Sequence, residues 1–278
     1  MILYRTLENV SKEELHHAFL EAFSDYQVKM DLSFEKFEQM LQRRGYRSEI
    51  SLGAFKEGKL VGFVFNGLRN WNGKKTAYDT GTGVVAESRR QGITSNMLFH
   101  IKKLLVEKQI EQYLLEVIIT NKSAFHLYQK QGFKIQREFS CFQLPKEKYI
   151  PITAFQVERV HQINLEPLKD SWDFEPSWQN SIESINVNPE AFHHFVARLE
   201  KKIVGYGIID KTTEDIPQIA VSKNHRRKGI GSSILTEMIK STDSKKISIL
   251  NVEKTMEKFL TKMGFEYSVG QYEMLLEF

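Results

Sequence analysis

Apolar residues recur at helical spacing in two stretches near the start of the chain, residues 12–24 and 33–44. Three runs with strand-like composition follow, from Ile50 to Phe55, from Leu60 to Leu68 and from Thr76 to Val85. Lysine, glutamate and glycine separate the first two runs, which is typical of a hairpin turn. The pattern therefore predicts two helices and then a group of consecutive strands.

Helices and strands alternate in the next part of the chain. A helix with one apolar face is predicted from Ile93 to Leu105, and a buried strand from Gln112 to Ile119. Asn121 opens another helix, which ends at Gly132, and a strand is predicted from Lys134 to Leu144. This order predicts an α/β (α+β) fold in which a mixed, mostly antiparallel sheet is flanked by helices.

Three segments of the sequence occur twice, and both sets keep the same order. The pairs are Glu57 to Phe63 with Glu200 to Tyr206, Arg89 to Ser95 with Arg226 to Ser232, and Gln131 to Lys134 with Met263 to Glu266. Matches in one order indicate a duplicated domain. The charged stretch between Pro145 and Pro151 is the predicted seam. We therefore expect two tandem domains, residues 1–146 and 147–278.

Composition limits the possible functions without selecting one. The 278 residues suit two domains, and 41% hydrophobic and 27% charged residues are ordinary for a globular protein. A net charge of +4 is too weak to favour nucleic acid as a partner. The single cysteine excludes an intrachain disulfide, and neither a membrane span nor a signal peptide is apparent, so we expect a cytoplasmic protein with no membrane partner. No zinc-binding pattern occurs, so no metal is expected, and nothing indicates the oligomeric state.

The segment from Arg89 to Thr94 joins a predicted strand to a predicted helix. A helix N-terminus has unpaired N–H groups and a partial positive charge, and Gly92 removes the Cβ that would keep an anion away. The segment therefore predicts a cradle for a pyrophosphate. The alternative is a capped helix with a solvated basic first turn, although cations are unfavourable at a helix N-terminus when no anion is present.

These residues resemble the coenzyme A motif of the GNAT superfamily of N-acetyltransferases, Arg-x-x-Gly-x-Gly/Ala. The second copy matches it fully from Arg226 to Gly231, whereas the first has Thr94 at the last position. A second signature of that family resembles the run from Asn121 through Tyr128 to Gly132 and Phe133. The resemblance implies a tandem acetyltransferase that uses acetyl-coenzyme A as its co-substrate.

The resemblance also implies the residues that hold the coenzyme A. In the first copy they are Thr82, Gly83, Val84, Arg89, Arg90, Gln91, Gly92, Ile93, Thr94 and Asn121. In the second copy the corresponding residues are Val221, Arg226, Arg227, Lys228, Gly229, Ile230 and Gly231. The strand that ends at Val84 would diverge from the strand predicted from Gln112 to Ile119, and the pantetheine arm would enter between them. Asn121 would either hold that arm or cap the following helix.

Candidate acid and base groups follow from the same resemblance and from side-chain chemistry. Tyr128 would protonate the departing thiolate, which a phenol can do. Glu116 is the candidate base, because a carboxylate in an apolar strand is unusual and burial would raise its pKa; the alternatives are a solvent-facing residue or a salt bridge. Asp79 is a second candidate base, and together with Asp25 and Tyr26 it is a candidate for the acceptor pocket.

Only the first copy keeps the predicted acid. The position that matches Tyr128 is Leu260 in the second copy, and leucine cannot donate a proton. We therefore expect the first domain to transfer an acetyl group to a primary amine of a small molecule or peptide. Two alternatives stay open: transfer of another acyl or aminoacyl group on the same tandem scaffold, or a sensor that binds acyl-coenzyme A without turnover.

Overall fold

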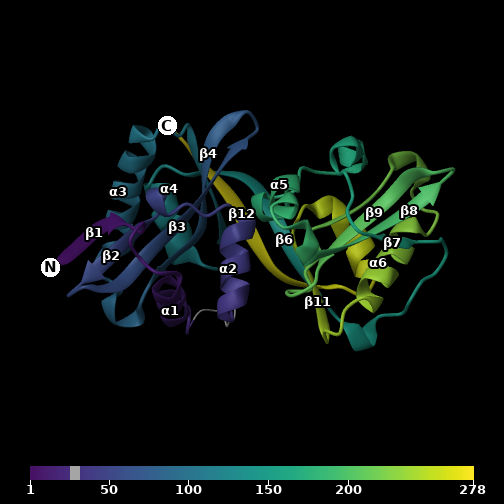
Figure 1. Cartoon of the computed structure of the whole chain (residues 1–278), viewed down its shortest axis with the longest axis horizontal. Helices are drawn as coiled ribbons and strands as arrows, with labels where there is room; N and C mark the ends of the chain where they lie inside the picture. Colours follow the sequence, from purple (N-terminus) through teal and green to yellow (C-terminus); the bar gives the residue numbers. More distant parts are fainter. Residues whose placement is uncertain (26–31) are drawn as a thin grey trace. The chain divides into compact units, whose positions relative to one another are not determined.

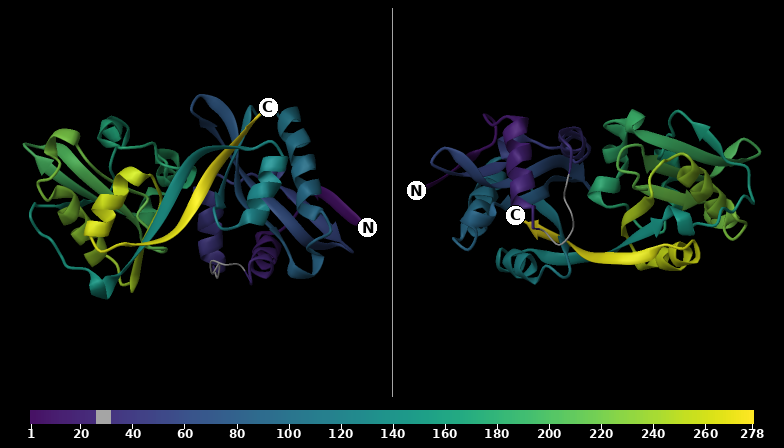
Figure 2. Two further views of the ribbon diagram at one scale, coloured as in Figure 1. Left: turned by 180° about the vertical axis from the view of Figure 1, so that it is seen from behind. Right: turned by 90° about the horizontal axis from the view of Figure 1, so that it is seen from below.

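The computed structural model describes residues 1–25 and 32–278, and these form two compact units. Unit 1 consists of Met1–Arg137 and Tyr272–Phe278, and unit 2 of Glu138–Gln271. The end of the chain thus returns to unit 1, and Figure 2 shows the C-terminus among the purple and blue elements of that unit. The compact units divide earlier than the predicted domain boundary after residue 146, which stays a prediction.

Unit 1 contains a mixed sheet with the strand order β1-β2-β3-β4-β5, continued by the parts of β12 and β6 that belong to this unit (Figure 1). The first four strands are antiparallel neighbours, whereas β4 and β5 are parallel. The elements are β1 (Ile2–Thr6), α1 (Lys12–Ala22), α2 (Phe34–Arg43), η1 (Ser48–Ile50), β2 (Leu52–Lys56), β3 (Lys59–Trp71), β4 (Lys74–Val84), η2 (Ala86–Ser88), α3 (Ile93–Glu107), β5 (Gln112–Ile118), α4 (Lys122–Lys130) and β6 (Lys134–Pro145).

Each face of the unit 1 sheet has its own apolar core. On the face covered by α1 and α2, the rings of Phe63 and Phe65 stack with their centroids 4.3 Å apart and pack in one cluster with Phe19 of α1. On the other face, Met97 and Ile101 of α3 are fully buried. The predicted apolar face of this helix is therefore confirmed, and the helix begins at Ile93 as expected.

Unit 2 has a similar plan, but short 3-10 helices and one five-residue α-helix precede its first hairpin in place of two longer helices. Its sheet has the order β10-β9-β8-β7, all antiparallel, and β11 pairs with β6. Its elements are η3 (Lys146–Lys148), β7 (Glu158–Val160), η4 (Glu166–Ser171), η5 (Trp178–Asn180), α5 (Ile182–Asn186), η6 (Pro189–Ala191), β8 (Phe192–Leu199), β9 (Lys202–Asp210), β10 (Gln218–Val221), η7 (Lys223–His225), α6 (Ile230–Lys240), β11 (Lys246–Val252), η8 (Lys254–Met256) and α7 (Glu257–Lys262). Strand β12 (Glu266–Glu277) begins in unit 2 and ends in unit 1.

The structure confirms the predicted fold class: helices pack against a mixed, mostly antiparallel sheet in unit 1 and against antiparallel strands in unit 2. Within the described residues, no helix has both the length and the apolar character needed to cross a membrane.

Candidate active site

The loop between β4 and α3 has the geometry of an anion cradle. Arg90 and Gly92 both have a positive φ, 62° and 74°, so the backbone turns sharply just before α3 begins. Gly92 is the N-cap of α3, and no side chain of the described residues caps this helix. A Cβ added at Gly92 would meet no described atom within 4 Å. The first-turn N–H groups of α3 therefore face open space in which an anion can bind.

This loop borders a cleft of about 900 Å³ in unit 1. The cleft is at the upper end of the size range of small-molecule and cofactor sites. Most of the predicted binding residues line it: Asp25, Thr82, Gly83, Val84, Arg89, Arg90, Gly92, Ile93, Thr94, Asn121 and Tyr128. Segments that are distant in the sequence, from the end of α1 to the start of α4, thus meet around one space.

The cleft opens where two neighbouring strands separate. The parallel pairing of β4 with β5 runs from Thr76 opposite Gln112 to Tyr78 opposite Leu114, and no later pair is recorded among the described residues of these strands. A register shift between β3 and β4 lies at the same level, where Phe65 and Asn66 of β3 face Gly81 and Asp79. Such a bulge bends a strand and redirects its side chains.

Asp79 and Tyr128 meet beside this bulge. The Tyr128 hydroxyl donates to Asp79 Oδ2 at 3.4 Å, the Thr82 hydroxyl donates to the same oxygen at 2.6 Å, and the Gly81 N–H donates to Oδ1 at 2.9 Å. Asp79 and Tyr128 are each only 8% exposed. Burial raises the pKa of Asp79 to about 6, although the three hydrogen bonds act in the opposite direction. The pair therefore joins a phenol in the cleft wall to a carboxyl group that titrates near neutrality.

Glu116 lies elsewhere. It alternates along β5 with Tyr113, Leu115 and Val117, whose side chains belong to the core beneath α3, and so it points to the opposite face of the sheet. There its carboxylate is hydrogen-bonded to Tyr78, whose pKa is raised well above its usual value by burial and by the charge of Glu116. Glu116 is not among the described residues that line the cleft. The strand that carries it was correctly predicted, but a sequence pattern alone does not show which face meets the cleft.

Asn121 caps a helix, one of the two roles considered for it. Its Oδ1 accepts hydrogen bonds from the Ala124 N–H at 3.2 Å and the Ser123 hydroxyl at 3.0 Å, at the start of α4. Because it also lines the cleft, its cap holds α4 and thereby Tyr128 in place. The amide is thus a structural part of the site whatever else it binds.

Sequence reasoning missed several polar residues of the cleft, and it included three residues, Asp79, Gln91 and Glu116, that are not among the described lining residues. Ser88, Ser95, Lys122 and Ser123 line the cleft. All four lie within the motifs or directly beside them, which is the signal that could have identified them. Gln91 is exposed and is not among the described lining residues. Tyr26 lies outside the described part of the chain.

Unit 2 reproduces the loop with nearly the same backbone. Arg227 and Gly229 have φ values of 60° and 80°, and Gly229 is the N-cap of α6. The alignment of Leu260 with Tyr128 is also confirmed, because the Phe265 N–H bonds the Leu260 carbonyl at 3.0 Å and the Phe133 N–H bonds that of Tyr128 at 3.1 Å. Leu260 is fully buried. Unit 2 therefore has the cradle without the phenol.

A cavity of about 550 Å³ adjoins this second loop. It is lined by six of the residues predicted for the second copy, Val221, Arg226, Arg227, Gly229, Ile230 and Gly231. Lys228 is exposed and is not among the described lining residues. This cavity is smaller than the cleft in unit 1.

The gap between β10 and β11 in unit 2 is filled by a buried segment, Ser177 to Ser181. Asn180 donates through Nδ2 to the Leu250 carbonyl at 2.9 Å, and its own carbonyl accepts from Gln218 Nε2 at 2.7 Å. Asn251 donates to the Ser177 hydroxyl at 3.2 Å. The segment thus bonds to both strands, and a cavity of only about 40 Å³ remains beside it. Unit 1 is open at the corresponding place.

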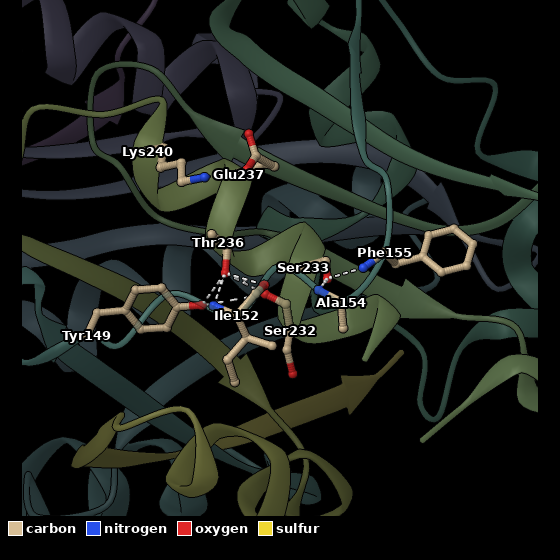
Figure 3. A network of polar contacts seen from close by, with 9 residues as sticks. All are labelled: Tyr149, Ile152, Ala154, Phe155, Ser232, Ser233, Thr236, Glu237 and Lys240. Atoms are coloured by element: carbon tan, nitrogen blue, oxygen red, sulfur yellow. Dashed lines mark hydrogen bonds and ion pairs between the residues drawn. The ribbon is translucent and has the colours of Figure 1, made fainter. Parts of the chain in front are cut away.

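A second segment of unit 2 covers the back of the loop. Figure 3 shows Ile152, Ala154 and Phe155 bonded through their N–H groups to the hydroxyls of Thr236 and Ser233 on α6. A Cβ added at Gly229 would lie 2.5 Å from the Ala154 Cβ, whereas the space at Gly92 is open. The two glycines therefore have the same conformation in different surroundings.

Two family models match the chain. The model of the acetyltransferase (GNAT) family matches residues 12–133, and the model of an acetyltransferase (GNAT) domain matches residues 190–267. No curated protein matches the chain in sequence.

Solved structures that resemble the chain have the same architecture over its whole length. A tandem GNAT protein from the clavulanic acid biosynthesis pathway is 13% identical, with a TM-score of 0.75 over 100% of this chain and 98% of that one. A putative acetyltransferase from Pyrococcus horikoshii is 15% identical, with a TM-score of 0.72 over 100% of this chain and 89% of that one. A GCN5-related N-acetyltransferase from Sphaerobacter thermophilus is 12% identical, with a TM-score of 0.72 over 99% of this chain and 95% of that one. At such identities the likeness shows the fold.

Proposed function

This chain belongs to the acetyltransferase (GNAT) family and carries two of its domains, and on that premise we propose that unit 1 transfers an acetyl group from acetyl-coenzyme A to a primary amine of a small molecule or peptide. The observation that carries the proposal is the meeting, in one cleft of about 900 Å³, of the uncapped start of α3 with Tyr128. A site of this kind can hold an anion at one place and supply a proton at another.

The residues of unit 1 suit coenzyme A. The first-turn N–H groups of α3 would hold the pyrophosphate, and the open space at Gly92 leaves room for it. The exposed guanidinium of Arg90 adds positive charge at the loop. Beyond Tyr78, the edge of β4 toward β5 would receive the pantetheine arm along Thr82, Gly83 and Val84. A backbone N–H near Val84 would polarise the carbonyl that is attacked.

Acetyl-coenzyme A supplies the acetyl group as a thioester whose leaving group is a thiolate. We assign to Tyr128 the donation of a proton to that thiolate. We assign to Asp79, in place of Glu116, the acceptance of the proton that the amine loses, since Asp79 contacts Tyr128 and has a pKa of about 6. The amine's proton, held on Asp79, then passes across the Tyr128–Asp79 contact to the Tyr128 phenolate, so the pair returns to its starting state after each turnover.

Binding can be tested by calorimetric titration of acetyl-coenzyme A into the wild type and the Gly92→Glu variant. A glutamate at the cradle opposes the pyrophosphate through bulk and charge, so binding should be abolished. Gly73→Glu is the matched control, because Gly73 also has a positive φ, 82°, and open space around its Cβ, but lies in the turn at the far end of β4. Gly229→Glu is a poor probe of unit 2, since it would collide with Ala154.

Turnover is tested separately, by release of free thiol from acetyl-coenzyme A in the presence of a panel of primary amines. Amine-dependent release that Tyr128→Phe strongly reduces is the expected result. Tight binding with equal thiol release in the presence and absence of every amine would instead favour a sensor. Absence of binding to the wild type would refute the proposal at its first step.

A further inference from the structure

The guanidinium of Arg89, the first residue of the loop motif, is occupied by contacts within unit 1. Its Nε donates to the Val84 carbonyl at 3.1 Å, and one terminal nitrogen donates to the Ala22 carbonyl at 2.8 Å. The two terminal nitrogens also reach the two carboxylate oxygens of Asp25, at 2.6 and 2.7 Å. A guanidinium has five N–H donors. Few donors therefore remain for a ligand, and the positive charge is already opposed by a carboxylate.

Unit 2 repeats these contacts at Arg226. Its Nε donates to the Val221 carbonyl at 3.1 Å, and its terminal nitrogens donate to the Ser171 carbonyl at 3.0 Å and to Asp173 at 2.7 Å. The local structure around the acceptors differs, because Ala22 ends a long α-helix whereas Ser171 ends a 3-10 helix. Two different segments thus deliver one carbonyl and one carboxylate to the same arginine.

The contacts are also independent of an open cleft. They are present in unit 2, where the segment from Ser177 to Ser181 fills the gap between the strands, as well as in unit 1, where the gap is open. A contact set that is built twice, from different segments and around different cavities, points to an architectural role for the arginine.

We propose that Arg89 is a positioning residue that fastens the α1 wall of the cleft, formed by Ala22, Phe23 and Asp25, to the end of β4, and that it does not bind the pyrophosphate. The α1 wall lines the cleft together with Val84. Its position therefore sets the width of the space beside the reacting groups. The part of this inference that concerns the amine depends on the proposed function, whereas the fastening itself does not.

Arg90 differs from Arg89 in the contacts of its side chain. It has a positive φ of 62°, its side chain is exposed, and no hydrogen bond or ion pair of that side chain is recorded among the described residues. Of the two adjacent arginines, Arg90 is thus the one with a guanidinium available to an anionic ligand. Of the two arginines in the motif, Arg89 thus holds the structure together and Arg90 is left to bind the ligand.

Hydrogen exchange tests the fastening without any ligand. Arg89→Gln removes the forked contacts, so the amides from Phe19 to Asp25 should exchange at least about tenfold faster than in the wild type. Arg226→Gln should accelerate exchange near Ser171 and leave the α1 wall unchanged. Arg198→Gln, which removes an exposed ion pair with Glu158, should change neither region. Unchanged exchange at the α1 wall of Arg89→Gln would overturn the proposal.

Kinetics test the consequence for the reaction. Arg89→Gln should raise the KM for the amine about tenfold while the Kd for acetyl-coenzyme A changes less than about threefold. Arg90→Gln should instead raise the Kd for acetyl-coenzyme A about tenfold while the KM for the amine changes less than about threefold. Arg89→Lys separates the two roles, because lysine keeps the charge but cannot make the forked contacts. A phosphate-binding residue would be largely rescued by lysine, whereas a fastening residue would not.

The outcomes separate this inference from the proposed function. If the wild type binds no acetyl-coenzyme A, the proposed function fails, and faster exchange in Arg89→Gln still supports the fastening. If Arg89→Gln weakens acetyl-coenzyme A binding as strongly as Arg90→Gln does, and Arg89→Lys restores it, then Arg89 is a ligand of the pyrophosphate and the inference is wrong.

Discussion

The buried carboxyl group of Asp79 gives unit 1 a stability that should depend on pH in a defined direction. Its pKa is about 6 in the folded protein against 3.8 for an ordinary aspartate, mainly because of burial. Between these values the unfolded chain loses the proton while the folded chain keeps it, so stability falls as the pH rises through this window. The separation corresponds to about 3 kcal/mol, at about 1.4 kcal/mol for each pH unit.

The variant Asp79→Asn removes this ionisation and keeps the size of the side chain. Relative to the wild type, the variant should therefore gain stability as the pH rises, by about 2 kcal/mol between pH 4.5 and 7.5, the part of the total that falls in this range. Urea unfolding at several pH values, followed by exchange of β4 amides so that unit 1 alone is observed, measures the difference.

The ionisation of Asp79 should also be visible in the pH dependence of the reaction rate. If Asp79 accepts the amine's proton, kcat/KM of the wild type should rise with pH through about 6. Asp79→Asn should be slow and should lack this rise. Thr82→Val removes a hydrogen bond that stabilises the carboxylate, so the rise should move to higher pH. A stability difference between wild type and Asp79→Asn that is constant with pH would refute the reasoning about burial.

Three further results are expected. Tyr128→Phe should lower kcat about 100-fold, with little change in the Kd for acetyl-coenzyme A, in steady-state kinetics and calorimetry. Calorimetric melting should show that Gly229→Ala costs unit 2 more stability than Gly92→Ala costs unit 1, since both incur about 1 kcal/mol of strain at positive φ but only Gly229 collides with Ala154. Burial lowers the pKa of His193 from 6.5 to about 4, so unit 2 should lose stability as the pH falls through this range, and His193→Gln should lose less.

Local patterns were sufficient to predict most elements. The helix predicted from Ile93 is observed as Ile93–Glu107, and the strand predicted from Lys134 to Leu144 as Lys134–Pro145. These elements are long and strongly periodic, so few alternatives compete with them. Strand β1 was not predicted, because Ile2–Thr6 is short and only half-buried. The elements of unit 2 before β8 are mostly single helical turns, which have no period to detect.

The candidate site could be predicted only where its parts are contiguous in the sequence. The loop around Gly92 and the helix that carries Tyr128 each lie within one short motif. The contact between Tyr128 and Asp79 joins residues far apart in the chain and depends on a register shift in β4. For the same reason the prediction favoured Glu116, whose unusual place in an apolar strand is visible in the sequence while the face on which it lies is not.

The two loops show why the number of copies of a motif does not give the number of active sites. The turn at Gly92 or Gly229 and the helix after it are set by a few adjacent residues, and both copies build them with the same backbone angles. An open cleft is instead a tertiary property, because two strands must diverge and no other segment may bond across them. In unit 2 the segment from Ser177 to Ser181 bonds to both strands, through Asn180 to the Leu250 carbonyl of β11 and to the Gln218 side chain of β10. With Leu260 at the position of the phenol and the segment from Ser177 to Ser181 bonded to both strands, unit 2 has the loop geometry of unit 1 but neither the tyrosine nor the open gap beside it.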